Sequence, residues 1–329
     1  MANPFIGRLI NYGIAKESTR GTFATATYWL PWRSGDFDDK FEVLSDESTL
    51  GVIEGVTGAA VSKTWSEGSI ELLVRDTSFG LILLSLFGTD TKSTTSGETI
   101  VYDHTFSVAQ SAQHQSLSIT KKDGLQTFGY AGAVVTSLEI VSTPDDFVVA
   151  TVGLKGKGGS SQSGTASYTS DTYTFTRSTC TVSRATSLAN LTSAPTTVSV
   201  SEVKITLTPN VVDDEVLGSA TPNDFLNTSF NVEAEFTLKF TDATYHDFVS
   251  AQTSTWYRIQ FKNATTIGTA AKPTLYFDLS QVKHESWERK DELGNVVMQT
   301  VKLVGRYNTT DTSMVKAVLR NSLSTAYSA

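Results

Sequence analysis

The chain of 329 residues contains a single cysteine, Cys180, so no disulfide bond can form within it. It also has only 3 Met and 7 Pro, and it lacks the apolar heptads of a helical bundle. No window approaches the roughly 20 apolar residues of a membrane span, and "MANPFIGRLINYGIAKES" has no apolar core long enough for a secretory signal. We therefore expect a protein without a membrane partner, made in a cytosol and stabilised by packing or assembly.

Clusters of basic residues are also missing. The formal net charge is −8, and the sequence pI is about 5.1. A protein that grips nucleic acid needs clustered Lys and Arg to displace counterions from the phosphates. The charge thus argues against a nucleic-acid-binding protein, although not against one along which DNA passes.

Patterns that carry catalysis or metal binding are absent as well. The four histidines are scattered and lack the i, i+4 spacing of a zinc helix; they are His104, His114, His246 and His284. The acidic groups at 145–146 and 213–215 do not follow the calcium-loop pattern, so we interpret them as solvated turns. No nucleophile elbow or phosphate-binding glycine loop is present. These absences argue against an enzyme and predict no cofactor and no metal.

Alternating strands are what the sequence does contain, and one of them occurs twice. "WSEGSIELLVRD" at 65–76 and "FNVEAEFTLKFTD" at 230–242 alternate apolar and polar residues, which is typical of a strand with one buried face. Each ends on an acid, Asp76 or Asp242, that is followed by a short apolar segment. We therefore predict a helix after each strand, with Gly88 ending the first.

The order of these elements is also repeated. In both halves a strand and a helix are followed by a strand, a second strand, a turn and a last strand, and the segments 148–156 and 297–305 are the clearest echo. Between the halves lies a stretch rich in Ser, Thr and Gly, which predicts a flexible linker. We expect two domains, at 1–160 and 171–329, joined by a linker at 161–170. Long connections are predicted near 41–60 and at 211–229.

Three segments resemble the tail tube proteins of long-tailed bacteriophages. "YGIAKESTRGTFATATYWLPW" is similar to their opening, and "EGSIELLVRDTSFGLILLSLFGT" resembles their strand followed by an apolar helix. "SVSEVKITLTPNVVDDEVLGSATPNDFLNTSFNVEAEFTLKF" resembles their later strand, long loop and strand. The resemblance spans nearly the whole chain, but it consists of residue types and their order, without an invariant catalytic signature.

This resemblance implies a mainly β fold of two tandem β-sandwich tail-tube domains, each with a short flanking helix. Sheets of neighbouring subunits would join into a central barrel, and a duplicated chain would form a trimeric ring that imitates six-fold symmetry. The function implied is a structural protein of the virion tail, made in the host cytoplasm. The implied partners are other copies of the chain, the tape measure, tail tip and tail terminator proteins, and double-stranded DNA that crosses the lumen without specific binding.

Polar rows on the predicted strands are candidates for the wall of the bore, although they could instead face outer solvent. These candidates are Glu71, Ser118, Thr120, Glu235, Thr237, Lys239, Gln260 and Lys262. Apolar residues outside the repeated strands, in 1–33, 211–229 and 311–322, are candidates for contacts between subunits or rings. They are Phe5, Trp29, Trp32, Val212, Leu217, Phe225, Val315 and Leu319. We expect these three segments to become ordered against a neighbour.

Two other classes of protein remain open. A β-sandwich adhesin or carbohydrate-binding module would share the Thr-rich strands and the 5 Trp. A capsid-decorating phage protein would share the β-rich composition. Electron microscopy of the purified protein distinguishes these classes from a tail tube, because only the last forms filaments.

Overall fold

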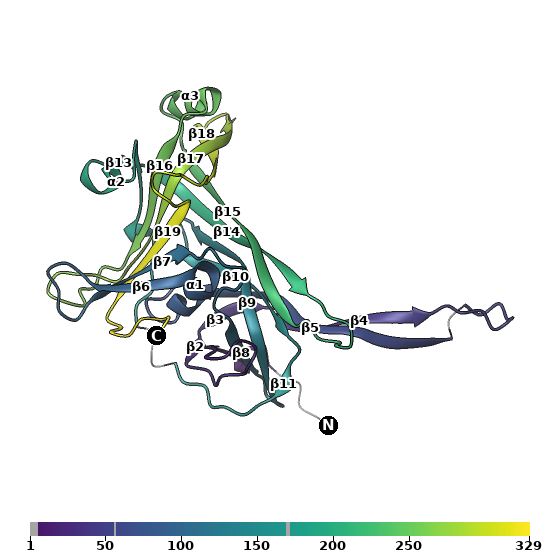
Figure 1. Ribbon diagram of the computed structural model, residues 1–329. Coiled ribbons are helices and arrows are strands. Elements are labelled where there is room, and N and C mark those ends of the chain that lie inside the picture. The colour runs from purple at the N-terminus through teal and green to yellow at the C-terminus, as the bar shows by residue number, and fades with distance from the viewer. Residues whose placement is uncertain (1–5, 56, 169–171) are drawn as a thin grey trace.

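The computed structural model describes residues 6–55, 57–168 and 172–329 and is mainly β, as the sequence predicts (Figure 1). Strands account for 53% of it. Its three α-helices are short: α1 (Phe79–Phe87), α2 (Asn190–Ser193) and α3 (Thr244–Ala251). Single 3₁₀ turns lie at Gly7–Leu9 and Arg177–Thr179.

The largest feature is a sheet of eight antiparallel strands, called here the long sheet. Its order is β4–β5–β10–β9–β14–β15–β18–β17, and the short β3 also pairs with β5. The first four of these strands come from the first half of the chain (6–168), and the last four come from the second half (172–329). The bounds are β3 (Trp32–Gly35), β4 (Asp38–Asp46), β5 (Gly58–Leu73), β9 (Thr127–Ser142), β10 (Val149–Lys157), β14 (Val200–Asp214), β15 (Asp224–Lys239), β17 (Thr274–Lys290) and β18 (Met298–Val304).

A smaller sheet accompanies each half of the long sheet. The first has the order β2–β1–β8–β9–β11, and the second has the order β13–β12–β16–β17–β19–β7–β6. Their remaining strands are β1 (Asn11–Lys16), β2 (Tyr28–Leu30), β6 (Gly88–Thr94), β7 (Tyr102–Val108), β8 (Leu117–Lys122), β11 (Ser160–Ser161), β12 (Cys180–Ala185), β13 (Thr196–Val198), β16 (Thr255–Lys262) and β19 (Val315–Asn321).

The strands β9 and β17 each belong to a small sheet at one end and to the long sheet at the other. Each changes sheet near one residue with left-handed backbone, Gly132 at φ 64° in β9 and Gln281 at φ 48° in β17. Glycine adopts this conformation without a steric penalty, whereas glutamine does so at a cost of about 1 kcal/mol. The same corner thus occurs once in each half.

Core side chains come from one face of each of the eight strands of the long sheet except β4, which has no buried residue. In β5 the apolar residues Ile70 and Leu72 are buried, and in β15 Ala234, Phe236 and Leu238 are buried, as the alternation predicts. The predicted helices are confirmed too. Helix α1 follows β5, all of its residues are buried, and it ends at a left-handed Gly88.

Helix α3 follows β15 and differs from α1 in its exposure. The amide of Thr244 donates a hydrogen bond to the Asp242 carboxylate, 2.9 Å away, but the N-cap is Ala243, so the acid lies one residue before the capping position that was predicted for it. Only Tyr245 of α3 is buried within the protomer, and the helix stands at the tip of the second half (Figure 1).

The long connections predicted near 41–60 and at 211–229 are wrong in large part, because both segments continue the strands as hairpins. The first hairpin is β4–β5, whose last pair is Asp46 with Gly58, and the second is β14–β15, with its turn at 215–223. The pairing of β3 and β4 with β5 shifts register at Trp32/Ser34 and at Glu42/Val43. The pairing of β14 with β15 shifts at Val200/Glu202 and at Asn210/Val211. The spacing from Trp32 to Glu42 equals that from Val200 to Asn210, so the two hairpins are irregular at matching places.

Two strand pairs tie the halves together. In the long sheet β9 pairs with β14, with Ile140 opposite Ile205 and Glu139 opposite Thr206. In the second small sheet β7, from the first half, pairs with β19 near the C-terminus. The halves therefore share both a sheet and a core.

Candidate assembly surfaces

The second face of the long sheet is polar and is the first candidate surface. Glu71, Glu235, Thr237 and Lys239 lie on it, because each alternates with buried residues of its own strand. The same face carries further charged residues from neighbouring strands, namely Glu139, Lys204, Glu233 and Lys302. Lys204 forms an ion pair of 2.6 Å with Glu139 across the junction of the halves. The face thus has charges of both signs, not an unbroken acidic surface.

Four of the other candidates for the bore lie elsewhere. Ser118 and Thr120 are buried, at 0% and 2% exposure, so the expectation that they line an exposed face is wrong. Gln260 and Lys262 lie on β16, which belongs to the second small sheet and not to the long sheet.

Ser118 is buried because its hydroxyl donates a hydrogen bond to a buried acid, Glu17, which the sequence analysis did not identify. The carboxylate of Glu17 is 3% exposed and accepts hydrogen bonds from the hydroxyls of Ser116 and Ser118, at 2.7 and 2.8 Å. The amides of Gly21 and Gly132 also donate to it, each at 2.7 Å. With this many donors a buried carboxylate is satisfied, and Glu17 thereby joins the first small sheet to the corner in β9.

The candidates for subunit contacts divide in the same way. Trp29, Phe225, Val315 and Leu319 are buried within the protomer, and the Trp32 indole donates to the Ile10 carbonyl at 2.8 Å. These side chains therefore belong to the protomer's own core, contrary to the expectation that they wait for a neighbour. Val212 and Leu217 are 47% and 106% exposed, and Phe5 lies outside the described residues.

The ends of the long sheet are the second candidate surface. Among the described residues, β4 pairs with β5 alone, and the 283–290 part of β17 pairs with β18 alone. Each end therefore presents a row of backbone N–H and C=O groups to solvent. Such an open edge is able to accept another strand.

The second hairpin is fastened to the first half by ion pairs. Asp213 lies 2.5 Å from the Lys63 ammonium and 2.7 Å from that of Lys155, and Glu215 also pairs with Lys63. Nearby, the Arg20 guanidinium donates to the Asp224 carboxylate at 2.7 and 2.8 Å. The acids at 213–215 are thus an intramolecular latch, and the interpretation of this group as a solvated turn is wrong.

The Asp213→Asn variant is expected to lose about 1.5–3 kcal/mol of unfolding free energy at pH 7, because two lysines lose a charged partner. Burial would raise the pKa of Asp213, but hydrogen bonds and charge from Lys155 and Lys63 outweigh it and hold the pKa below its usual value. The latch therefore contributes above about pH 4 and is lost as pH falls through the lowered pKa. Urea denaturation at pH 7 and pH 3 measures this difference.

The control for this prediction is Glu202→Gln, which makes the same change of charge at an exposed position of β14. It should leave the unfolding free energy within about 0.5 kcal/mol of the wild type. Equal losses in both variants at pH 7 would contradict the latch.

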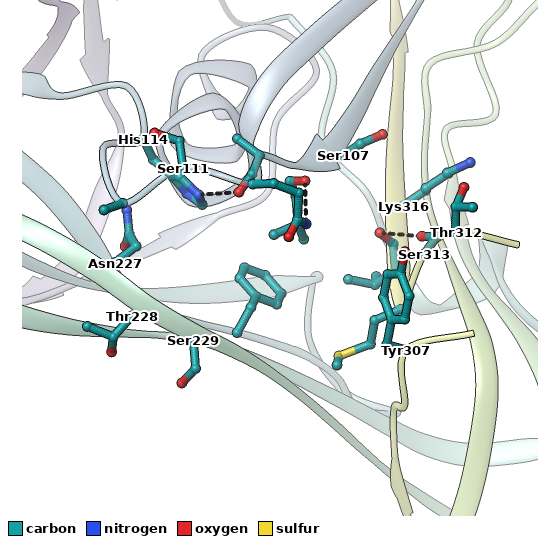
Figure 2. Close-up of a pocket in the computed structure, with 17 residues that line it drawn as sticks. Ser107, Ser111, His114, Asn227, Thr228, Ser229, Tyr307, Thr312, Ser313 and Lys316 are labelled. Carbon is teal, nitrogen blue, oxygen red and sulfur yellow. Dashed lines mark hydrogen bonds between the residues drawn. The ribbon is translucent and has the colours of Figure 1, made fainter. Parts of the chain in front are cut away.

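A polar hollow of about 610 Å³ lies between the halves. Figure 2 shows Asn227, Thr228 and Ser229 along one side of it, with Tyr307, Thr312 and Ser313 across from them. Its lining is rich in hydroxyl and amide groups, and Lys316 is the one Lys, Arg, Asp or Glu side chain among the described residues that line it. We find no arrangement of acid, base and nucleophile in it that suggests catalysis.

Residues 6–55, 57–168 and 172–329 contain neither a cluster of metal-ligating side chains nor a membrane-spanning helix. No group of three or more His, Cys, Asp or Glu side chains there is placed to hold a metal ion. None of the helices in those ranges is both long enough and apolar enough to cross a membrane. The single Cys180 lies in β12, where burial raises its pKa to about 12.

An open-edged sheet with one polar face is typical of structural proteins that extend a sheet from copy to copy. The profile of one such family, described as phage tail tube protein, matches residues 7–301, so the chain belongs to the phage tail tube protein family. It is a non-enzymatic structural component of the phage tail in the virion, and tail tube proteins self-assemble into a tube. A search of curated proteins finds no match.

Proposed function

We propose that this chain is a duplicated tail tube protein of a long-tailed phage, in which two tandem units fill two of six equivalent places around the tube. The observation that carries this proposal is the order of the long sheet, where four strands of the first half are followed by four corresponding strands of the second. The matching pairing shifts and the left-handed corners at Gly132 and Gln281 support it. The units are 1–160 and 171–329, and 161–170 links them.

In the proposed ring, three chains join end to end through their open edges. The 283–290 part of β17 pairs with β3 and β4 of the next chain, as β9 pairs with β14 inside one chain. Twenty-four strands about 4.8 Å apart and tilted by about 45° give a backbone diameter of roughly 50 Å. That bore admits a DNA duplex after side chains are added. The polar face of the long sheet then lines the lumen, while the small sheets lie outside.

Rings stacked on one another form the conduit through which viral DNA leaves the tail. Val212 and Leu217 are exposed on the second hairpin and are proposed contacts between rings. The tape measure protein would occupy the bore before ejection, and the tail tip and tail terminator proteins would cover the two ends of the tube. DNA crosses the lumen without specific binding, since acids such as Glu139 and Glu235 on its wall lie next to the lysines and offset their attraction for phosphate.

A cross-linking experiment tests this proposal. The correspondence of β9 with β17, and of the first hairpin with the second, predicts which residues face each other between chains. Glu139 lies opposite Thr206 inside the chain, and the corresponding residues at the chain ends are Glu288 and Asp38. In a Cys180→Ser background, Asp38→Cys with Glu288→Cys is expected to give covalent dimers and trimers after oxidation, because facing Cβ atoms lie about 4.5–5.5 Å apart. Non-reducing gels and averaged tube cross-sections are the measurements.

Two matched pairs control this experiment. Glu139→Cys with Thr206→Cys should cross-link within one chain, and Asp38→Cys with Ser286→Cys tests a slipped register. Strict six-fold cross-sections with one chain at each position would refute the duplicated ring. Preferential linkage of the slipped pair would refute the register while leaving the tube intact, and a protein that forms no tubes would refute the assembly.

A further inference from the structure

The outer part of the first hairpin, the described residues of 40–61, extends from the body of the protomer, and its base contacts the second hairpin, where Glu42 and Leu44 line a hollow with residues 215–222. Every described residue from 40 to 61 is exposed, and the hairpin projects far from the body of the protein (Figure 1). It nevertheless carries many large apolar side chains: Phe41, Val43, Leu44, Leu50, Val52, Ile53 and Val61, all at least 54% exposed. An exposed apolar surface of this kind marks an interaction site in a soluble protein.

The second hairpin shows where such a hairpin can lie, because it rests on the first half of its own chain. Beyond the latch at Asp213, the amide of Thr64 donates to the Ala220 carbonyl at 2.7 Å, and the amide of Asn227 donates to the Ala112 carbonyl at 2.8 Å. Phe225, in the same segment, is 0% exposed. The contacts come from β5, β10 and the segment before β8, all in the first half.

The matching pairing shifts allow the two hairpins to be compared residue by residue. Phe41 corresponds to Pro209, Leu44 to Val212, and Ser45 to Asp213. Phe41 is 60% exposed, whereas Pro209 is buried. Leu44 and Val212 are both exposed, at 57% and 47%. The protomer therefore covers Pro209 but leaves the corresponding Phe41 open to solvent. We expect a partner to bind at such an exposed apolar position.

The receiving surface can be located by the same comparison. Lys63 and Lys155, which hold Asp213, correspond to Ser229 on β15 and Val304 on β18 in the second half. Ser229 is exposed and Val304 is half-buried, so this patch is open in the protomer. It lies next to the 283–290 edge of β17, where the proposed function places the next chain.

We propose that the first hairpin of one copy lies across the second half of the adjacent copy, over Ser229 and Val304, and that Phe41 becomes buried there. This inference rests on the proposed ring and adds to it a second contact beside the strand pairing. The chemistry differs from that inside the chain. The charged triad of Asp213, Lys63 and Lys155 is replaced by Ser45, Ser229 and Val304, so the contact between chains is uncharged at these positions.

Two serine variants on the first hairpin test this inference. Phe41→Ser is expected to raise the critical concentration for tube formation at least about tenfold, since burial of a phenylalanine is lost at each contact. Lys40→Ser, on the same strand and also exposed, is expected to change it less than about twofold. Both monomers should unfold at the wild-type temperature, because both side chains are exposed in the protomer. Pelleting and light scattering measure the critical concentration.

A photo-cross-linker then locates the contact. Benzoylphenylalanine in place of Ser45, activated in assembled tubes, should link to peptides that contain Ser229 or Val304 of another chain, as mass spectrometry would show. Equal effects of the two serine variants, or linkage only to other peptides, would overturn the inference and leave the ring standing. If the wild-type protein formed no tubes, the proposed function and this inference would fail together.

Discussion

Gly68→Ala is expected to destabilise the protomer by about 3 kcal/mol or more. Alanine disfavours the backbone conformation of this residue, and its Cβ would also clash with neighbouring backbone atoms. Gly68 has φ 156°, and a Cβ built there would lie 2.5 Å from the Cα of Phe37 and 2.7 Å from the carbonyl oxygen of Asp36. Both neighbouring atoms are backbone and do not move aside as a side chain does. The Phe37 ring is 0% exposed and packs edge-on against Tyr130 at 5.0 Å, so a shift of this segment disturbs the core.

The matched control lies on the same strand. A Cβ at Gly58 would meet its nearest neighbour, the Cβ of Asp46, at 3.9 Å, so Gly58→Ala should change the unfolding free energy by no more than about 0.5 kcal/mol. Urea denaturation followed by circular dichroism compares the two variants. Similar curves for both would contradict the steric argument.

Changing Glu71 and Glu235 to lysine together is expected to slow DNA ejection at least about tenfold at low salt while tubes still form. Both residues lie on the proposed wall of the lumen, and Glu235 faces Lys204 and Lys302 on its two neighbouring strands. A lysine at this position creates a cluster of three cations, repeated around every ring. Such a cluster binds phosphates by releasing counterions, and the delay should therefore shrink as salt rises.

The control is the double variant Glu71→Gln and Glu235→Gln, which removes the acids without adding cations. Ejection through these tubes should stay within about twofold of the wild type. Phage carrying each variant can be compared by the rate at which DNA is released in 50 and 300 mM salt. If the lysine variant ejects at the wild-type rate at low salt, the polar face of the long sheet does not line the lumen.

Strands β5, β10, β15 and β18 of the long sheet were predictable because each has one buried face and alternates along the sequence. Ile70 and Leu72 in β5 and Phe236 in β15 are examples. Strand β8 also alternates, and the same reasoning failed there, because Ser118 is polar and buried at once. Its partner, Glu17, is far away in sequence, and no periodic pattern reports a hydrogen bond between distant segments.

The hairpins were missed for a different reason. Pro209 cannot donate to a strand ladder and interrupts the strand pattern of β14. At the pairing shift at Asn210/Val211 the extra residue is Thr228, so the alternation of the facing strand β15 moves by one residue. Val211 and Val212 therefore looked like parts of a loop. The assembly candidates failed through burial: Trp29 and Phe225 were recognised as apolar, but only the three-dimensional structure shows that the protomer itself covers them.

The pairing of β7 with β19 has a mechanical consequence. It exists inside the chain because the β6–β7 hairpin is inserted between α1 and β8. The second half has no such insertion among its described residues, since α3 ends at Ala251 and β16 begins at Thr255. In the proposed ring, the junctions within a chain, which include the β7–β19 pairing, are therefore stiffer than the junctions between chains, and the two kinds alternate around the ring. Bending of the tail would occur mainly at the junctions between chains, and the tail could curve without straining any protomer.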